Sequence, residues 1–247
     1  MATYVLSDLH GCSKIFNRFL NGGYLNHGDR LYIVGDILDR GSDSYQIYQT
    51  IKNHDNIFLL KGNHELMFQD YYEEHYINHS NDALSKLTYL ANGGDSTLES
   101  IERYAQEKGL DGAEQYRELY EFVKDLPLYK TLAIKDKKYI LVHAGTSGKK
   151  TIEDESEEDL LWIRHQFFQR EIPGDITYVF GHTPALFLNP DQSLDPWFAH
   201  NKIGIDGGLA MGEKRGQLNV LNLDTQEVIV IKMGQKDRVY KFKNDGQ

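Results

Sequence analysis

The sequence contains little cysteine and no long apolar run. Cys12 is its single cysteine, which excludes an internal disulfide framework and a cysteine-rich zinc site. No apolar stretch approaches the ~18 residues that a membrane span needs, and the opening residues lack the basic and apolar regions of a signal peptide. We therefore predict a protein of the reducing cytoplasm that has no membrane partner.

Positive charge is also scarce. The 247 residues include 37 acidic residues against 27 lysines and arginines, so the formal net charge is -10. A general nucleic-acid-binding surface needs clustered lysines and arginines, and the sequence shows no such run. We expect no general nucleic-acid binding. A polyanionic substrate would need a local cationic site, such as a bound metal ion.

Short apolar runs of strand length recur through the chain. The first three, at residues 3–6, 30–34 and 56–60, alternate with stretches of helical spacing at 13–20 and 42–53, which predicts a βαβαβ opening. Further runs lie at 138–142, 176–180, 202–206 and 218–233, the last with the pattern of a hairpin. We predict an α/β fold with mixed sheets in a single domain over residues 1–247.

Strand signals stop between residues 66 and 126, where Leu, Tyr, Glu and Lys recur at helical intervals. We interpret this segment as a helical insertion with a break at residues 92–94 and a capping box at residues 96–99. Four tyrosines at helical spacing are expected to be core residues rather than the lining of a groove. They are Tyr71, Tyr72, Tyr76 and Tyr89.

Five of the strand-like runs are followed at once by residues that bind metals or phosphate. These clusters lie at residues 7–11, 35–41, 62–65, 143–145 and 181–183. The carboxyl ends of strands form the ligand crevice of open α/β sheets, so residues far apart in sequence would meet there. Asp8 and His10, two residues apart on an extended chain, would point the same way. One such cluster is usually a turn or a cap, but five at five strand ends predict one functional site.

The side chains in these clusters are of the types that bind divalent metal ions. Carboxylate, imidazole and amide groups without cysteine suit Mn, Fe or Zn and disfavour softer metals. Six candidate ligands are enough for two ions if one carboxylate bridges them, an arrangement used for in-line displacement at phosphorus. They are Asp8, His10, Asp36, Asn63, His143 and His182.

The motif set is similar to that of the phosphoprotein phosphatase branch of the calcineurin-like metallophosphoesterases. That branch carries GDxHG, GDxxDRG, GNHE, HAG and GH in this order. Here the motifs are SDLHG at 7–11, GDILDRG at 35–41, GNHE at 62–65, HAG at 143–145 and GHTP at 181–184. Ser7 replaces the first glycine, a position that carries no ligand in the family pattern. The chain most resembles the bacterial and phage-type serine/threonine protein phosphatases, with the symmetrical diadenosine tetraphosphate hydrolases nearby.

The resemblance implies a β-sandwich flanked by helices, with two divalent ions at one edge. Mn is the metal expected first, with Fe and Zn as alternatives. One ion would be bound by Asp8, His10 and Asp36, and the other by Asp36, Asn63, His143 and His182.

The resemblance also implies roles for the remaining motif residues. His64 would be the general acid, and Asp39 would orient its imidazole and keep it protonated. Arg40, together with Asn63, would bind the substrate phosphate, because a planar guanidinium makes bidentate contacts to phosphoryl oxygens. Arg164 matches a second phosphate-binding arginine, with a helix-surface arginine as the alternative.

Three functions are compatible with these motifs. The first is hydrolysis of phosphoserine or phosphothreonine in proteins, or of a phosphorylated small molecule, by a hydroxide that two metal ions activate. The second is hydrolysis of dinucleoside polyphosphates such as diadenosine tetraphosphate, for which the sequence shows no base-binding fingerprint. The third is a binding module without catalysis, whose usual sign would be a lost ligand or a lost general acid. No such loss occurs, and likeness to the bacterial members favours the first function.

Overall fold

The computed structural model describes residues 1–79, 83–172 and 174–242. Its first sheet has six strands in the order β11-β10-β9-β1-β2-β3. These strands are Thr3–Leu6 (β1), Arg30–Ile33 (β2), Ile57–Leu59 (β3), Leu218–Asn222 (β9), Glu227–Ile231 (β10) and Arg238–Lys241 (β11). β1, β2 and β3 are parallel, whereas β9 pairs antiparallel with β1 and with β10, and β10 with β11.

The second sheet has five strands in the order β4-β5-β6-β8-β7. These strands are Tyr129–Ile134 (β4), Lys137–Val142 (β5), Ile176–Phe180 (β6), Trp197–Ala199 (β7) and Lys202–Gly204 (β8). β5, β6 and β8 are parallel, and the two edge strands are antiparallel to their neighbours. Each sheet thus has three parallel strands whose carboxyl ends lie at the same edge.

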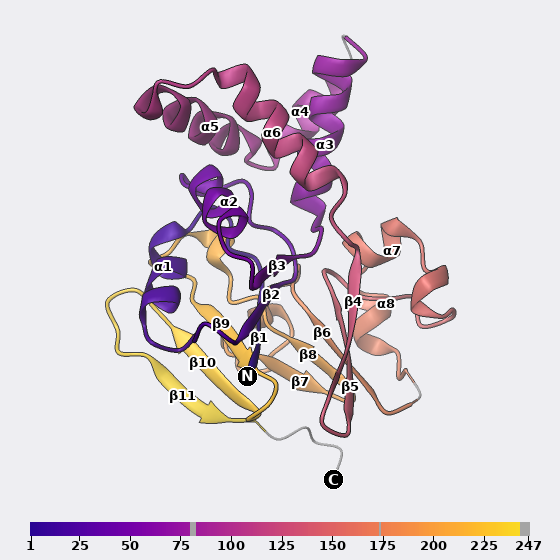
Figure 1. The fold of residues 1–247 in the computed structure, drawn as a ribbon. Helices are drawn as coiled ribbons and strands as arrows, with labels where there is room; N and C mark the ends of the chain where they lie inside the picture. Colours follow the sequence, from indigo (N-terminus) through magenta and orange to yellow (C-terminus); the bar gives the residue numbers. More distant parts are fainter. Residues whose placement is uncertain (80–82, 173, 243–247) are drawn as a thin grey trace.

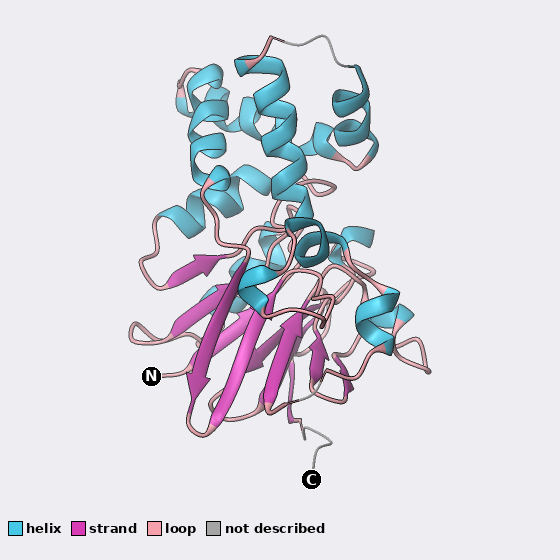
Figure 2. Ribbon diagram, turned by 90° about the vertical axis from the view of Figure 1, so that its right-hand side faces the viewer, coloured by secondary structure: helices cyan, strands magenta, loops and turns pink. Residues whose placement is uncertain are grey.

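Helices connect the parallel strands and extend beyond them (Figures 1 and 2). Helices α1 (Ser13–Asn21) and α2 (Ser44–Lys52) link β1, β2 and β3, which confirms the predicted βαβαβ opening. The group of helices drawn above the sheets in Figure 1 comprises α3 (Asn63–Tyr72), α4 (Ala83–Ala91), α5 (Gly94–Lys108) and α6 (Gly112–Lys124). The shorter helices are η1 (Glu73–Ile77), η2 (Ile152–Asp154), α7 (Glu157–Trp162), α8 (His165–Gln169), η3 (Ala185–Phe187) and η4 (Leu209–Met211).

Side chains of the two sheets share one apolar layer. Val5, Tyr32 and Val228 of the first sheet are buried there with Leu141 and Val179 of the second. Each buried side chain of this size contributes about 1.5–3 kcal/mol relative to an exposed one. The sheets therefore form the predicted β-sandwich flanked by helices, and the α/β class with mixed sheets is confirmed.

The sequence patterns do not predict β4, β7 or β11. All three are edge strands. β4 and β11 expose about half or more of their residues and β7 has only three, so a regular alternation of buried and exposed side chains is absent. The apolar periodicity that marks a half-buried strand is weak under these conditions.

The helical insertion is present, but its predicted capping box is wrong. Helix α5 begins at Gly94, after Gly93 in a left-handed conformation, and no side chain caps it. Thr97 lies in the first turn and bonds to Asp39 instead. Three of the four tyrosines are buried as predicted, whereas Tyr76 remains 42% exposed.

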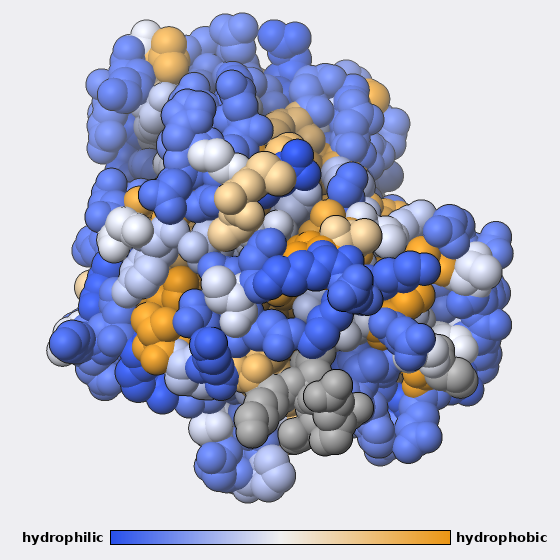
Figure 3. Space-filling view, turned by 60° about the horizontal axis from the view of Figure 1, so that its bottom comes forward, coloured by the Kyte–Doolittle hydropathy of each residue, from blue (hydrophilic) through white to orange (hydrophobic). Residues whose placement is uncertain are grey.

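The surface at the foot of the molecule is mostly hydrophilic. Figure 3 shows this face, where the hydrophobic areas are small and separated by hydrophilic side chains. Within the described ranges, no helix combines the length and the apolar character needed to cross a bilayer.

Candidate metal centre and catalytic dyad

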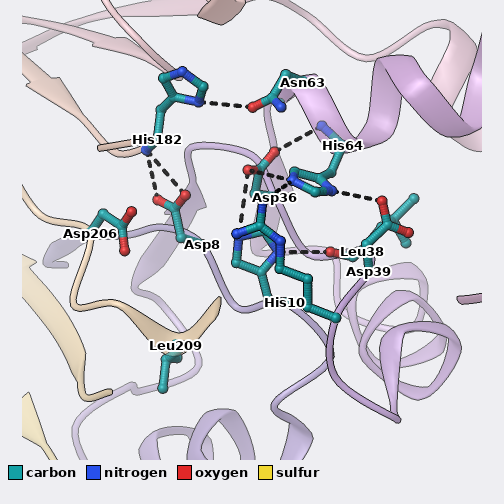
Figure 4. A network of polar contacts seen from close by, with 12 residues as sticks. Asp8, His10, Asp36, Leu38, Asp39, Asn63, His64, His182, Asp206 and Leu209 are labelled. Carbon is teal, nitrogen blue, oxygen red and sulfur yellow. Dashed lines mark hydrogen bonds and ion pairs between the residues drawn. The ribbon is translucent and has the colours of Figure 1, made fainter. Parts of the chain in front are cut away.

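The five predicted clusters converge at one site. Each follows a parallel strand at once: β1, β2 and β3 in the first sheet, and β5 and β6 in the second. Figure 4 shows Asp8, Asp36, Asn63 and His182 pointing toward one another there. Ligand-type side chains from both halves of the chain therefore share one buried centre.

The backbone turns sharply at the site. Six of the predicted site residues have positive φ, a conformation that non-glycine residues adopt mainly where surrounding structure enforces it. They are Asp8 (52°), His10 (41°), Asp36 (57°), Asp39 (68°), Arg40 (70°) and His182 (64°). The expectation that Asp8 and His10 lie on an extended chain is wrong, because the chain leaves the β conformation as soon as the strand ends.

Asp36 lies between two groups of candidate ligands. Its Oδ2 is 3.6 Å from Nε2 of His10, and its Oδ1 is 3.4 Å from Nε2 of His143. Asp36 and His10 form one potential metal-binding group with His64, and Asp36 forms another with His143 and His182. One carboxylate thus presents a different oxygen to each group.

Hydrogen bonds orient two of these imidazoles. Nδ1 of His10 lies 2.9 Å from the carbonyl oxygen of Leu38, and Nδ1 of His143 lies 2.8 Å from that of Val34. A carbonyl only accepts, so each Nδ1 carries the hydrogen and each neutral ring leaves Nε2 bare toward Asp36. Burial lowers the pKa of His143 to about 3 and lowers that of His10 as well. Both rings are therefore neutral, the form that binds metal.

Asn63 completes a donor set that fits a cation. Its Oδ1 lies 2.8 Å from Nε2 of His143 and 2.9 Å from Nδ1 of His182. The bare Nε2 of His143 and the amide oxygen are both acceptors, so no hydrogen bond joins them, whereas a cation would satisfy both lone pairs. Oxygen and imidazole ligands without sulfur suit a borderline divalent ion.

The carboxylates at this centre repel one another. Burial raises the pKa of Asp8 and that of Asp36 well above the ordinary value, and the neighbouring acids add to both shifts. Asp206 is one of these neighbours and is not among the residues predicted from the sequence (Figure 4). Burial raises the pKa of Asp206 to about 6. It lies two residues after the end of β8, so the strand-end rule that identified the other five clusters applies to it too.

Two motif glycines permit the close approach of backbone to these carboxylates. A Cβ at Gly62 would lie 2.2 Å from Oδ1 of Asp36, and a Cβ at Gly181 would lie 2.0 Å from Oδ2 of Asp8. The backbone amides beside them bind the same acids: that of His64 donates to Asp36, and that of His182 donates to Asp8. Glycine at both positions lets the chain hold the carboxylates in place.

Glu65 fixes the loop after β2 and is a second residue with no predicted role. Its carboxylate accepts hydrogen bonds from the backbone amides of Asp36, Ile37, Leu38 and Gly62. It joins the loop that carries the shared carboxylate to the start of α3. The signal in the sequence is its place three residues after Gly62, as in a capping box.

His64 and Asp39 form a buried dyad. Nδ1 of His64 lies 2.7 Å from Oδ2 of Asp39. The other oxygen of Asp39 accepts from the hydroxyls of Tyr89 (3.0 Å) and Thr97 (2.6 Å), which belong to α4 and α5. The insertion helices therefore hold the acid that orients the imidazole.

The contacts of His64 indicate where its ring hydrogen lies in this structure. Its Nε2 lies 3.0 Å from a guanidinium nitrogen of Arg40, which only donates, so Nε2 accepts and the hydrogen lies on Nδ1. Burial, followed by the charge of Arg40, lowers the pKa of His64 to about 3. Asp39 contacts Nδ1 of the ring, and burial raises the pKa of Asp39 itself to about 7. Its predicted role of keeping the imidazole oriented and protonated stays a prediction.

A cavity of about 330 Å³ opens onto this centre. Arg40 and Arg164 both line it. Arg164 donates to the backbone oxygen of His182 and to Oγ1 of Thr183, so its guanidinium is fixed at the cavity wall. Arg164 is an exposed residue at the N-cap of α8, and both the phosphate-binding role and the helix-surface role stay predictions.

This chain is similar to several known proteins. A bis(5'-nucleosyl)-tetraphosphatase (asymmetrical) of Halalkalibacterium halodurans is 24% identical over 267 residues, which cover 97% of this chain and 97% of that protein. A crystal structure provisionally assigned as a diadenosine tetraphosphatase matches with a TM-score of 0.60 and 15% identity, over 94% of this chain and 93% of that one. The structure of a Saccharomyces cerevisiae protein serine/threonine phosphatase similar to human PP5 matches with a TM-score of 0.57 and 15% identity. The match covers 98% of this chain and 80% of that one.

The two solved structures share the fold of this chain. At 15% identity, they show nothing about its function. The sequence profile of the calcineurin-like phosphoesterases matches residues 1–206, which include all five predicted clusters as well as Asp206. This chain belongs to the calcineurin-like phosphoesterase family.

Proposed function

We propose that this chain hydrolyses dinucleoside polyphosphates at a two-metal centre. The position of Asp36 carries the proposal, because its two oxygens face two separate groups of ligand atoms. One ion would be held by Asp8, His10 and Asp36, and the other by Asp36, Asn63, His143 and His182. Two bound divalent ions supply Lewis acidity to the phosphoryl oxygens and to the attacking water.

The residues of the chain would bind the phosphoryl group and supply a proton. Arg40 and Arg164 line the cavity over the centre, where planar guanidinium groups suit phosphoryl oxygens. With Arg40 turned to the phosphate, Nε2 of His64 would be free to take up a proton from water and pass it to the leaving group. His64, oriented by Asp39, is then placed to move a proton at Nε2.

Sequence similarity over the full length favours dinucleoside polyphosphates over phosphoproteins. The relative in Halalkalibacterium halodurans is named a bis(5'-nucleosyl)-tetraphosphatase, and the alignment covers 97% of both chains. The fold does not separate the two substrate classes, because solved structures similar to this one carry both names. We therefore place the nucleotide substrate ahead of the phosphoprotein substrate, the reverse of the order that the motifs alone favour.

Hydrolysis of phosphoserine or phosphothreonine is the second candidate, and the complete dyad favours it. A serine alkoxide is a poor leaving group and needs a proton, whereas a nucleotide phosphate leaves readily as an anion. The 2.7 Å contact between Nδ1 of His64 and Asp39 would orient the ring for such a transfer at Nε2.

A side-by-side assay tests the choice. Diadenosine tetraphosphate and a phosphoserine peptide are offered separately to Mn-loaded protein, and kcat/KM is measured for each. We expect a higher kcat/KM for the dinucleotide. A higher value for the peptide would select the second candidate, and no hydrolysis of either at full metal occupancy would refute both.

A further inference from the structure

We infer that a basic pocket beside the metal centre binds the distal phosphates of a polyphosphate leaving group. The pocket has a volume of about 610 Å³ and includes Lys14, Lys214 and Arg215 in its lining. The inference rests on the proposed function, because it assigns a subsite for the part of the substrate that is not attacked.

The pocket adjoins the cavity over the metal centre. Met211 lines both. The floor is formed where the loops after β1 and β2 cross, with the backbone amide of Asp43 donating to the oxygen of Gly11. Gly11 follows the candidate ligand His10, and Gly41 follows Arg40, so two stretches of chain pass directly from one cavity into the other.

The three cations of the pocket are free to bind an anion. Among the residues that the structure describes, none of Lys14, Lys214 and Arg215 has an ion pair or a side-chain hydrogen bond. Lys214 and Arg215 are exposed and adjacent in the loop after η4. The chain as a whole has a net charge of -10, so three cations without an ion pair make the region beside the reaction centre more positive than the rest of the chain.

The acids of the same pocket already have partners. Asp43 accepts hydrogen bonds from the hydroxyl of Ser13 and from the guanidinium of Arg103. Glu213 accepts from the backbone amide of Lys14 at the start of α1. The pocket presents a net positive charge to a ligand, because its lining holds three cations against two acids, and one of these acids is also paired with Arg103.

The pocket lies next to Arg40, which contacts the proposed proton donor. His64, the proposed proton donor, contacts Arg40, and Arg40 precedes Gly41 in the pocket lining. A phosphate chain that leaves past His64 and Arg40 would reach Lys214 and Arg215 beyond Met211. A phosphoserine side chain has no further phosphates to place there, so the pocket distinguishes the two substrate classes.

Binding of a non-hydrolysable polyphosphate tests the pocket without any need for catalysis. The probe is bis(methylene)triphosphonate, and methylphosphonate is the matched ligand with a single phosphonate group. Calorimetry on Mn-loaded protein compares wild type, Lys214→Gln/Arg215→Gln and the control Lys149→Gln/Lys150→Gln. The control removes the same two charges from a basic pocket that shares no residue with the reaction cavity.

We expect the pocket variant to weaken triphosphonate binding about tenfold, as the loss of two partly exposed charge contacts would, and to leave methylphosphonate binding unchanged. The control variant should bind both ligands as wild type does. Equal triphosphonate affinity in the two variants, or an equal loss for both ligands, would overturn the inference. Because these are binding measurements, they decide the inference even if diadenosine tetraphosphate is not hydrolysed, which would refute the proposed function alone.

Discussion

At the scale of single residues, two different neighbours act on the two ring nitrogens of His64. Asp39 fixes the ring through Nδ1, and Arg40 occupies Nε2. In this arrangement Nε2 accepts from Arg40 and carries no hydrogen, so the ring can donate there only after Arg40 has moved and Nε2 has taken up a proton from water. The role of His64 should therefore depend strongly on the leaving group.

Replacement of His64 by Asn should slow hydrolysis of a phosphoserine peptide by about 10²-fold or more, the usual contribution of a positioned proton donor. Hydrolysis of p-nitrophenyl phosphate and of diadenosine tetraphosphate should slow much less, because both leaving groups depart as stable anions. The measurement is kcat/KM for the three substrates, with bound metal counted in parallel. Equal losses on all substrates, together with loss of one ion, would instead make His64 a metal ligand.

The pKa shifts at the centre predict that metal binding releases protons. Burial raises the pKa values of Asp8 and Asp36, whereas burial lowers those of His10, His143 and His182. The histidines are thus already neutral, and the protons displaced by metal come from the carboxylates. As pH falls toward the raised pKa values, protons compete with the ions and the apparent metal affinity should drop.

Calorimetric titration with Mn from about pH 8 to about pH 5 measures how the apparent metal affinity changes with pH. Titrations in two buffers of different ionisation enthalpy give the number of protons released. Affinity should fall and proton release should rise toward the acid end of the range. Constant affinity with no proton release would contradict the raised pKa values of the two acids.

At the scale of elements, the insertion helices support the site from outside the sheets. Thr97 of α5 accepts from the backbone amide of Asp39 and donates to its carboxylate, and all these groups are buried. A valine at position 97 has nearly the volume of threonine, but it leaves the backbone amide and the carboxylate of Asp39 without the hydroxyl that binds them. A buried polar group without its partner costs about 1–3 kcal/mol.

Thr97→Val should therefore lower the free energy of unfolding by about 1–3 kcal/mol, measured by chemical denaturation. Thr225→Val is the matched control, because Thr225 is exposed in the turn between β9 and β10. The control should stay within about 0.5 kcal/mol of wild type. Equal effects of the two substitutions would show that Thr97 does not stabilise Asp39.

The sequence predicts the central elements better than the marginal ones. Strands buried on the sandwich interface carry continuous apolar runs, so β1, β2, β5 and β6 are recognisable. The edge strands β4, β7 and β11 lack that burial and are not predicted. The capping box was misassigned because local spacing at residues 96–99 cannot reveal that Thr97 bonds to a loop 58 positions away in sequence.

At the scale of the whole molecule, the site exists only where the two sheets meet. Asp8, Asp36 and Asn63 follow strands of the first sheet, whereas His143 and His182 follow strands of the second. Strand-end motifs predict that these residues converge, because parallel strands place their carboxyl ends at one edge. They do not predict which oxygen faces which ring, the contact of Arg40 with His64, or the basic pocket, because these depend on tertiary packing of distant loops.

In the proposed site, the carboxylate of Asp36 is shared by two ions. Metal analysis of the chelator-stripped protein after reloading with Mn, on wild type and Asp36→Asn, tests it most directly. We predict two ions per wild-type chain with hydrolysis restored, and fewer than two tightly bound ions with hydrolysis largely lost in the variant, because both ions lose a ligand. Two tightly bound ions in the variant, or full hydrolysis by metal-free wild type, would contradict the account.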